Sequence, residues 1–326
     1  MIHRFNILSD EEGKRLDAYL SDKLTLPRTK IKEMFEEGHV RVLGKTPKPS
    51  LKVKKNMKIE GEIPAEKPFV LEPQSIPLHI LYEDEFFLAV NKPKDMVVHP
   101  SFGHTEGTLV NAVLAYLQET GQGQRAGDHG KACYRQPPAA EHLGVFAENT
   151  RPGIVHRLDK GTTGVILVAK DSRTQEKLSS LFKDRAVSKT YRAIVEGTLE
   201  TKEGLISGKI GRHPVERKKM TVLRQGGRDA ETGYRVIERL EGFTYIEAYP
   251  RTGRTHQIRV HLAHAGHPVA GDETYGRNAR DKADRPLLHA YRIAFTHPVR
   301  EIPILIIAPV PEDILDFIAH HHGKPI

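Results

Sequence analysis

Cysteine and long apolar runs are nearly absent from this sequence. The 326 residues include one cysteine, Cys133, which excludes an internal disulfide and a zinc site built from several cysteines. The longest apolar run, IPILIIAPV at 302–310, is too short to span a membrane. The first sixteen residues lack the apolar core of a secretory signal peptide. We therefore expect a cytoplasmic protein that makes no contact with membranes.

The signatures of several common enzyme classes are also missing. The sequence has no glycine-rich phosphate loop, no GxSxG elbow, no dinucleotide-binding fingerprint and no plausible cysteine nucleophile. Histidines at 256, 261, 264 and 267 suggest a metal site, but on one helix this spacing scatters them around the axis. The run HHH at 320–322 is typical of a solvated tail. We therefore expect no bound metal.

Positive charge is concentrated in one short segment. The formal net charge is +8, from 50 basic and 42 acidic residues. Between Arg28 and Lys58, ten Lys or Arg are opposed by three Glu, which gives this segment +7 (ten minus three). Such a local excess favours a nucleic-acid partner over a merely solvated lysine-rich face. The candidate RNA contacts in this segment are Arg28, Lys30, Lys32, Lys54 and Lys55.

The pattern of apolar residues predicts two domains joined by a linker. Residues 1–62 predict a small module with helices at 15–24 and 27–38 and short strands at 39–44 and 57–63. Residues 63–76 contain three prolines and no periodicity, which is typical of a linker. A larger domain follows at 77–326. Within it, residues 119–150 are rich in Gly, Gln and Pro and predict a mobile insertion.

The larger domain predicts many strands and few helices. Strands are expected as a hairpin within 79–93, as a strand pair within 151–170, and at 189–197, 219–223, 232–240 and 243–249. Helices are expected at 108–117, 172–185, 255–266 and 311–322. This order favours an α+β fold on a large mixed, mainly antiparallel sheet flanked by helices and loops.

The stretch RPGIVHRLDKGTTGVILVAK at 151–170 carries more charge than a tight turn requires. Gly and Thr at 161–164 supply the small residues of a turn, yet Arg157, Asp159 and Lys160 crowd just before them. The neighbouring cations favour an ionised Asp159, which suits a carboxylate that acts as a nucleophile or a base. A turn aspartate that binds backbone N–H groups is the alternative, and spacing alone leaves both open.

Four segments together resemble the RluA-type pseudouridine synthases. HRLDKGTTG at 156–164 closely resembles their catalytic signature, usually HRLDKDTSG, with Gly161 in place of an acidic residue and Thr163 in place of Ser. The segments that resemble the first core strand, the K-x-Y segment and the arginine motif of the family are 89–100, 188–197 and 251–276. The match covers residues 78–310. The basic module resembles the ribosomal-protein-S-four-like (alpha-L) RNA-binding domain that many of these enzymes carry.

The resemblance implies a reaction and a role for each site residue. Uridine in RNA is isomerised to pseudouridine, and no cofactor is needed because nothing is added or lost. Asp159 matches the indispensable aspartate, which attacks the anomeric carbon or helps to remove a sugar proton. Arg259 matches the arginine that pairs with it, and Tyr191 the tyrosine that stacks on uracil. Arg157 matches the residue that fills the place of the flipped base, with His156 as a further candidate RNA contact.

We also expect a particular RNA substrate, and two other functions remain as alternatives. Large-subunit ribosomal RNA is the expected substrate, transfer RNA is the alternative, and the protein is expected to be a monomer. A non-catalytic RNA-binding factor of ribosome assembly would lack Asp159, Tyr191 or Arg259, and all three are present. A metal-dependent nuclease or hydrolase that uses the histidines would lose its activity to a chelator.

Overall fold

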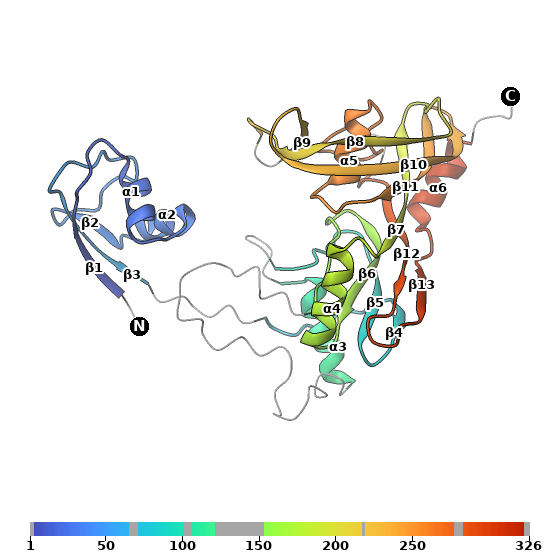
Figure 1. Cartoon of the computed structure of the whole chain (residues 1–326), viewed down its shortest axis with the longest axis horizontal. Helices are drawn as coiled ribbons and strands as arrows, with labels where there is room; N and C mark the ends of the chain where they lie inside the picture. The colour runs from blue at the N-terminus through green and yellow to red at the C-terminus, as the bar shows by residue number, and fades with distance from the viewer. Residues whose placement is uncertain are drawn as a thin grey trace. The chain divides into compact units, whose positions relative to one another are not determined.

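The computed structural model describes residues 3–64, 71–100, 106–120, 153–216, 219–276 and 283–322. They belong to two compact units, one within Met1–Leu71 and one that begins at Glu72 (Figure 1). Nearly all of the predicted insertion at 119–150 lies outside the described residues. No helix among the described residues is long and apolar enough to cross a membrane.

The N-terminal unit contains two helices and a three-stranded antiparallel sheet in the order β1-β3-β2 (Figure 1). Its elements are β1 (His3–Leu8), α1 (Leu16–Lys23), α2 (Arg28–Glu36), β2 (Val40–Val42) and β3 (Lys58–Ile63). Both predicted helices and both predicted strands are confirmed. Strand β1 was not predicted, although exposed and half-buried residues alternate along it.

The core of the N-terminal unit follows from the helical spacing of its apolar residues. Leu16 and Leu20 lie four positions apart on α1, and Ile31 and Met34 lie three apart on α2. All four are fully buried. The opposite faces of the helices remain polar, so the basic residues of this segment stay outside the core.

The second unit is built on one ten-stranded sheet. Its order is β4-β5-β6-β12-β7-β11-β10-β8-β9, with β13 paired to β12. Among the described residues, every pairing is antiparallel except that of β6 with β12. The strands are β4 (Ile80–Glu83), β5 (Phe87–Lys92), β6 (Thr163–Ala169), β7 (Ser188–Glu196), β8 (Glu203–Arg212), β9 (Met220–Leu223), β10 (Arg228–Leu240), β11 (Phe243–Pro250), β12 (Leu288–Thr296) and β13 (Pro303–Ile307).

Among the residues that the structure describes, four helices accompany this sheet: α3 (Leu109–Glu119), α4 (Ser172–Lys183), α5 (Gln257–His264) and α6 (Glu312–His320). All four were predicted, as were the hairpin β4–β5 and strands β7, β9, β10 and β11. The mainly antiparallel α+β fold is therefore confirmed. Strands β8, β12 and β13 were missed.

The predicted strand pair within 151–170 is wrong in its first half. Within the described part of this stretch, 153–170, only β6 is a strand, and Ile154 makes a single bridge to Val168. The chain then leaves the sheet, turns where the Thr162 N–H donates to the carbonyl of Asp159, and re-enters at Thr163. Gly164 has φ of +108°, and a Cβ there would lie 2.3 Å from the Ala290 carbonyl of β12. Only glycine lets the turn join the sheet so closely.

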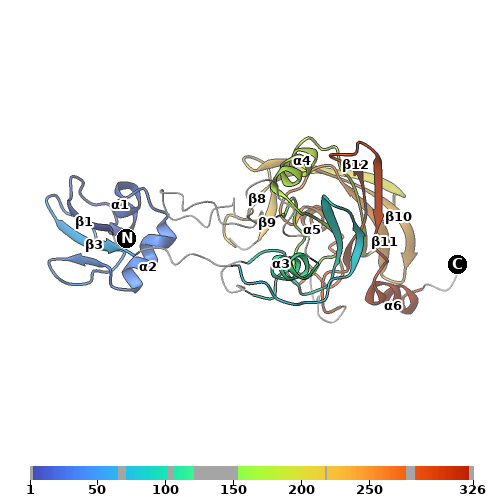
Figure 2. The same cartoon turned by 90° about the horizontal axis from the view of Figure 1, so that it is seen from below.

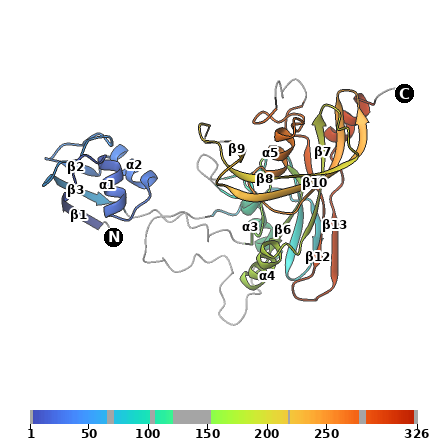
Figure 3. The ribbon, with the colours of Figure 1, turned by 45° about the horizontal axis from the view of Figure 1, so that its top comes forward.

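Helices α5 and α6 cover opposite faces of β7 and β11. Ala193 and Val195 of β7 pack with Ile258 of α5, whereas Ile194 between them packs with Phe317 of α6. This alternation is the two-residue period of a strand. Figure 2 shows the sheet curving around α5, and Figure 3 shows α4 beside β6. The curvature brings the N-terminal end of α5 toward the turn before β6.

Candidate active site

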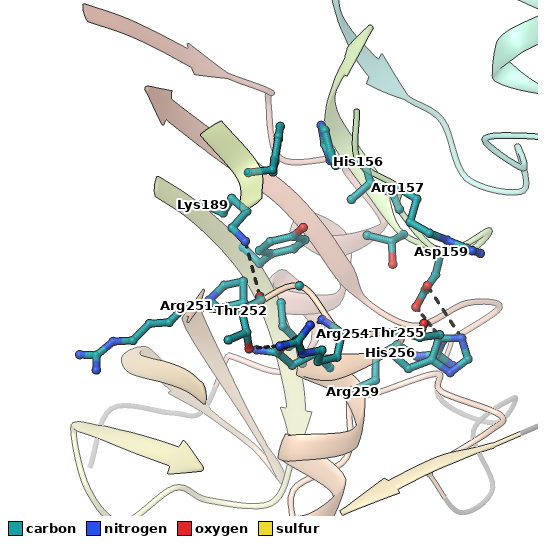
Figure 4. Close-up of a pocket in the computed structure, with 18 of the residues that line it drawn as sticks. His156, Arg157, Asp159, Lys189, Arg251, Thr252, Arg254, Thr255, His256 and Arg259 are labelled. Atoms are coloured by element: carbon teal, nitrogen blue, oxygen red, sulfur yellow. Dashed lines mark hydrogen bonds and ion pairs between the residues drawn. The ribbon is translucent and has the colours of Figure 1, made fainter. Parts of the chain in front are cut away.

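A cavity of about 460 Å³ lies where the turn before β6 meets β7, α5 and the loop 250–256 (Figure 4). Its size is within the usual range for small-molecule sites. Three predicted catalytic residues line it, namely Asp159, Tyr191 and Arg259. They come from segments more than thirty positions apart in sequence, and the fold brings them together.

Asp159 is held by its backbone neighbours. The carbonyl of Lys160 accepts a hydrogen bond from Lys92 Nζ at 3.1 Å, and that of Gly161 accepts one from Arg285 Nη1 at 3.1 Å. Lys92 and Arg285 are both buried. Two buried basic side chains therefore bind the carbonyls of the two residues that follow the aspartate, and they fix the backbone of this turn.

Lys92 was missed as a site residue. Its ammonium group also donates to the carbonyls of Pro93 and Met96, at 2.8 and 2.9 Å, so all three N–H bonds are used. Burial lowers the pKa of Lys92 to about 7. The segment NKP at 91–93 was assigned only to a core strand, and nothing in its spacing indicates that the lysine reaches a turn 68 positions away.

Arg259 connects the aspartate to a second, fully buried carboxylate. Its Nη1 donates to Asp159 Oδ2 at 2.9 Å, while Nε and Nη2 donate to the two oxygens of Asp272 at 2.7 Å each. This bidentate contact fixes the guanidinium plane. Burial lowers the pKa of Arg259, but the hydrogen bonds and charge of Asp272 and then Asp159 outweigh burial and raise it. Asp159 therefore has a permanent, oriented cation beside one oxygen.

Tyr191 lies on β7 with its ring in the wall of the cavity. Burial, and next the negative charge of Asp159, raise the pKa of its hydroxyl. The phenol is therefore protonated at neutral pH. It offers an apolar ring face and a hydroxyl that donates a hydrogen bond.

The structure places His156 and Arg157 differently. The His156 ring stacks on Phe182, with 4.5 Å between ring centroids, and its Nε2 accepts a hydrogen bond from the Leu167 N–H at 2.9 Å. Burial lowers its pKa to about 3, so it is neutral. Arg157 is exposed and lines the cavity two positions before Asp159. Arg157 can therefore make a charged contact with RNA, whereas His156, which is neutral and packed on Phe182, cannot.

The cavity has a basic rim that was not predicted. Lys189, Arg185, Arg251 and Arg254 line it together with Arg157. Burial lowers the pKa of Lys189, whose Nζ lies 3.5 Å from the carbonyl of Thr252. No sequence pattern indicates this rim, because its residues come from separate segments, at 157, 185–189 and 251–254.

The predicted RNA contacts of the basic segment all belong to the N-terminal unit. Arg28 donates to Asp17 at 2.9 Å, and Lys32 lies 3.2 Å from Glu36. Lys54 and Lys55 are exposed, whereas the Lys30 side chain is only 20% exposed. Four of the five therefore have an accessible charge.

The four histidines considered as metal ligands do not gather. Helix α5 ends at His264, so His256 and His267 lie outside it. His261 is buried against the Thr232 hydroxyl at 2.9 Å, and the His267 ring lies 2.8 Å from the Glu196 carbonyl. Among the described residues no three His, Cys, Asp or Glu side chains are grouped as metal ligands.

Comparisons with known proteins show the family to which the chain belongs. A family model described as RNA pseudouridylate synthase matches residues 86–264, more than half of the chain. The chain is 38% identical over 315 residues to the ribosomal large subunit pseudouridine synthase D of Neisseria meningitidis. The aligned region covers 93% of this chain and 77% of the relative. The chain is 36% identical over 329 residues to the enzyme of that name from Escherichia coli K12, covering 96% and 92%.

A solved structure, human RNA pseudouridylate synthase domain containing 1, superimposes with a TM-score of 0.54 at 26% identity, covering 75% of this chain and 86% of the human chain. The matched family segment contains Asp159, Tyr191 and Arg259. The chain therefore belongs to the RNA pseudouridylate synthase family and is an isomerase of its RluA/RluD type.

Proposed function

We propose that Asp159 is the essential carboxylate of this synthase and that its substrate is a uridine of large-subunit ribosomal RNA. The observation that carries the first part is the chain of contacts Asp272–Arg259–Asp159 on the cavity wall. A guanidinium that is itself fixed by Asp272 binds one oxygen of Asp159 and so orients this carboxylate toward the cavity. The second part is supported by the names of the relatives.

The reaction requires one bond to break and another to form. The bond between ribose C1′ and uracil N1 is cleaved, the base rotates, and C5 bonds to C1′. C5 then loses a proton and N1 gains one, so atoms balance without a cofactor. Arg259 occupies Oδ2 of Asp159, which leaves Oδ1 for the substrate. Oδ1 is the reacting oxygen in either mechanism, whether Asp159 attacks C1′ or removes a sugar proton.

Tyr191 is proposed to hold the detached base. Its ring forms part of the cavity wall, and stacking on an aromatic ring is tolerant of rotation because a stacked base keeps its face in contact. Since its hydroxyl is protonated, Tyr191 can donate a hydrogen bond but is not a ready base. Stacking is therefore its first role.

Arg157 is proposed to occupy the gap that the target uridine leaves in the RNA. Flipping a base out costs a few kcal/mol, and a side chain inserted in the stack offsets part of that cost. Arg157 is exposed and only two residues from Asp159, so a base entering the cavity leaves its gap near the guanidinium. The rim residues Lys189, Arg251 and Arg254 suit the flanking phosphates.

The N-terminal unit is proposed to bind a large RNA without regard to its base sequence and so to increase affinity. Its basic segment carries seven of the eight net positive charges, and Lys32, Lys54 and Lys55 are exposed. Contacts of this kind supply affinity rather than base choice. A footprint wider than one nucleotide and its neighbours suits a folded ribosomal RNA.

A pseudouridine map of total RNA, from cells with and without this gene, tests the assignment. Loss of sites in large-subunit ribosomal RNA is the expected result, and complementation with Asp159→Asn should fail to restore them. Sites lost only from transfer RNA would overturn the ribosomal part and leave the chemistry intact. Sites restored by Asp159→Asn would overturn the role of the aspartate.

A further inference from the structure

His256 lies immediately before α5 and faces the free oxygen of Asp159. Its Nε2 is 3.8 Å from Asp159 Oδ1, and both side chains are about one fifth exposed (Figure 4). The residue has φ of 55° and ψ of 20°, a left-handed conformation that few side chains adopt. Such backbone strain is maintained where the surrounding structure enforces it, which is common at functional sites.

The hydrogen-bond network around His256 determines which ring nitrogen carries the proton. The Met220 N–H donates to the Tyr275 hydroxyl oxygen at 3.0 Å. Burial raises the pKa of that hydroxyl, so it keeps its own proton. Among the described residues, His256 Nδ1 lies within hydrogen-bond distance of this hydroxyl, 2.9 Å from the Tyr275 oxygen, and can accept its proton. When Tyr275 donates this proton to Nδ1, a neutral His256 carries its own proton on Nε2.

We propose that His256 is a positioning residue: as a neutral imidazole it presents Nε2–H to Oδ1 of Asp159, and Tyr275 fixes the tautomer that makes this possible. The carboxylate is then held at both oxygens, by Arg259 at Oδ2 and by His256 at Oδ1. The gap of 3.8 Å exceeds a hydrogen bond, and contacts of this kind tighten when substrate fills the site. The proposal rests on the role assigned above to Asp159.

Burial favours the neutral form of His256. It has the largest effect and lowers the pKa of the ring, and the cations Arg259 and Arg157 lower it by smaller amounts than the two nearby carboxylates raise it. Asp159, the second-largest influence, and Asp272 raise the pKa, but burial outweighs them and the pKa is lowered overall. Protonation at low pH would turn a neutral donor into a cation paired with Asp159. An ion pair at Oδ1 makes this oxygen a weaker nucleophile and base, so activity should fall as His256 becomes charged.

The left-handed backbone dictates which variant tests the proposal. Asn adopts this conformation more readily than most residues, so His256→Asn removes the ring with least disturbance to the start of α5. Tyr275→Phe removes only the hydroxyl that donates to Nδ1. Tyr116→Phe is the matched control, because Tyr116 lies on α3 and its hydroxyl donates to Glu83 at 2.7 Å.

The first measurement is nitrogen NMR of the full-length protein labelled with ¹⁵N-histidine. At pH 7.5 the signals absent from His256→Asn should show protonated Nε2 and unprotonated Nδ1. Tyr275→Phe should lose this single-tautomer pattern, and Tyr116→Phe should keep it. A ring protonated on Nδ1, or on both nitrogens, would overturn the proposal.

The second measurement is the pH dependence of turnover on RNA that contains the target uridine. His256→Asn should lower kcat by about 10- to 100-fold, the range expected when a reacting group is misplaced, with KM within about threefold of wild type. The decline at acidic pH should move to higher pH in Tyr275→Phe, because a hydrogen bond that favours the neutral ring is lost. Wild-type kcat in His256→Asn, or an unmoved profile in Tyr275→Phe, would contradict the inference.

Asp159→Asn in the same assay separates this inference from the proposed function. If Asp159→Asn is inactive and His256→Asn behaves as wild type, the role of His256 alone is wrong. If Asp159→Asn remains active, there is no essential carboxylate to position, and both proposals fail. Thermal unfolding of His256→Asn within about 2 °C of wild type shows that a loss of kcat does not come from lost structure.

Discussion

The two units use their basic residues in opposite ways. In the N-terminal unit the cations lie on the surface, as in the Lys32–Glu36 pair, whose side chains are 70% and 62% exposed. In the second unit the basic side chains that organise the site are buried: Arg259 is 6% exposed and Lys92 0%. Exposed charges are screened by salt and contribute little to stability. Buried ones must be fully paired, and they fix geometry.

The largest expected effect comes from breaking the buried pair. Asp272→Asn removes the fully buried one of the two carboxylates that pair with Arg259, so the free energy of unfolding should fall by about 3–5 kcal/mol. Turnover should fall by at least about 100-fold, because Arg259 no longer fixes Asp159. Urea unfolding and single-turnover kinetics measure the two effects. Asp229→Asn, which removes an exposed pair with Lys209, is the control and should cost less than about 1 kcal/mol.

The units should also differ in their response to acid. Burial lowers the pKa of His156 to about 3 and of His289 to about 4. Their unfolded value is about 6.5, so the unfolded chain binds more protons below that pH and the second unit loses stability as pH falls from 6.5 toward 4. Asp17 of the N-terminal unit has its pKa lowered to about 2, first by its hydrogen bond with Arg15. Its contribution is lost only below about pH 4.

Two-dimensional NMR of the full chain between pH 7 and pH 3 tests this order. Signals of the second unit should disappear at higher pH than those of the N-terminal unit. The reverse order would show that the buried histidines do not control acid stability.

The sequence predicted those parts of the fold that local patterns encode. Helices with apolar residues three and four positions apart were found, because a helix buries one face of its own residues. Strand β8 was missed since it contains Gly204, Gly208 and Gly211, which weaken a strand pattern. The reason for one of these glycines is distant in sequence: a Cβ at Gly204 would lie 2.7 Å from the Tyr234 ring of β10.

The site residues also fall into those that local sequence motifs predicted and those that they did not. Asp159, Tyr191 and Arg259 were predicted because three motifs resemble those of a known family, and the cavity brings them together. Lys92, Asp272 and Tyr275 were not predicted, although each lies in a segment that resembles a motif of the family. Their roles depend on contacts between segments far apart in the chain, and no local spacing carries that information.

An intermediate effect is expected at the mouth of the cavity. Arg157→Ala should reduce turnover on a structured RNA about tenfold more than on a flexible single strand, because only the structured RNA must be unstacked. Rates on a stem-loop and on an unstructured oligonucleotide of the same sequence provide the comparison. Lys209→Ala is the control for loss of an exposed cation. Equal losses on both RNAs would contradict the wedge role of Arg157.

The smallest effect is expected on the surface of the N-terminal unit. Replacing Lys54 and Lys55 by Gln should leave turnover at saturating RNA unchanged and reduce the slope of log affinity against log salt by roughly 1 to 2. Fluorescence titration of RNA binding at several salt concentrations measures the slope. Arg300→Gln, on the second unit, should leave it unchanged. A slope that is the same in the double variant would mean that this basic surface does not contact RNA.

The most direct test of the central claim compares turnover and RNA affinity in Asp159→Asn. The amide cannot act as a nucleophile or base, so pseudouridine formation should fall below about 0.1% of wild type, in line with losses of essential reacting groups. RNA affinity and its salt dependence should remain within about twofold, because the basic surfaces of both units are untouched. Turnover above a few per cent of wild type, with the protein folded and RNA bound, would contradict the account.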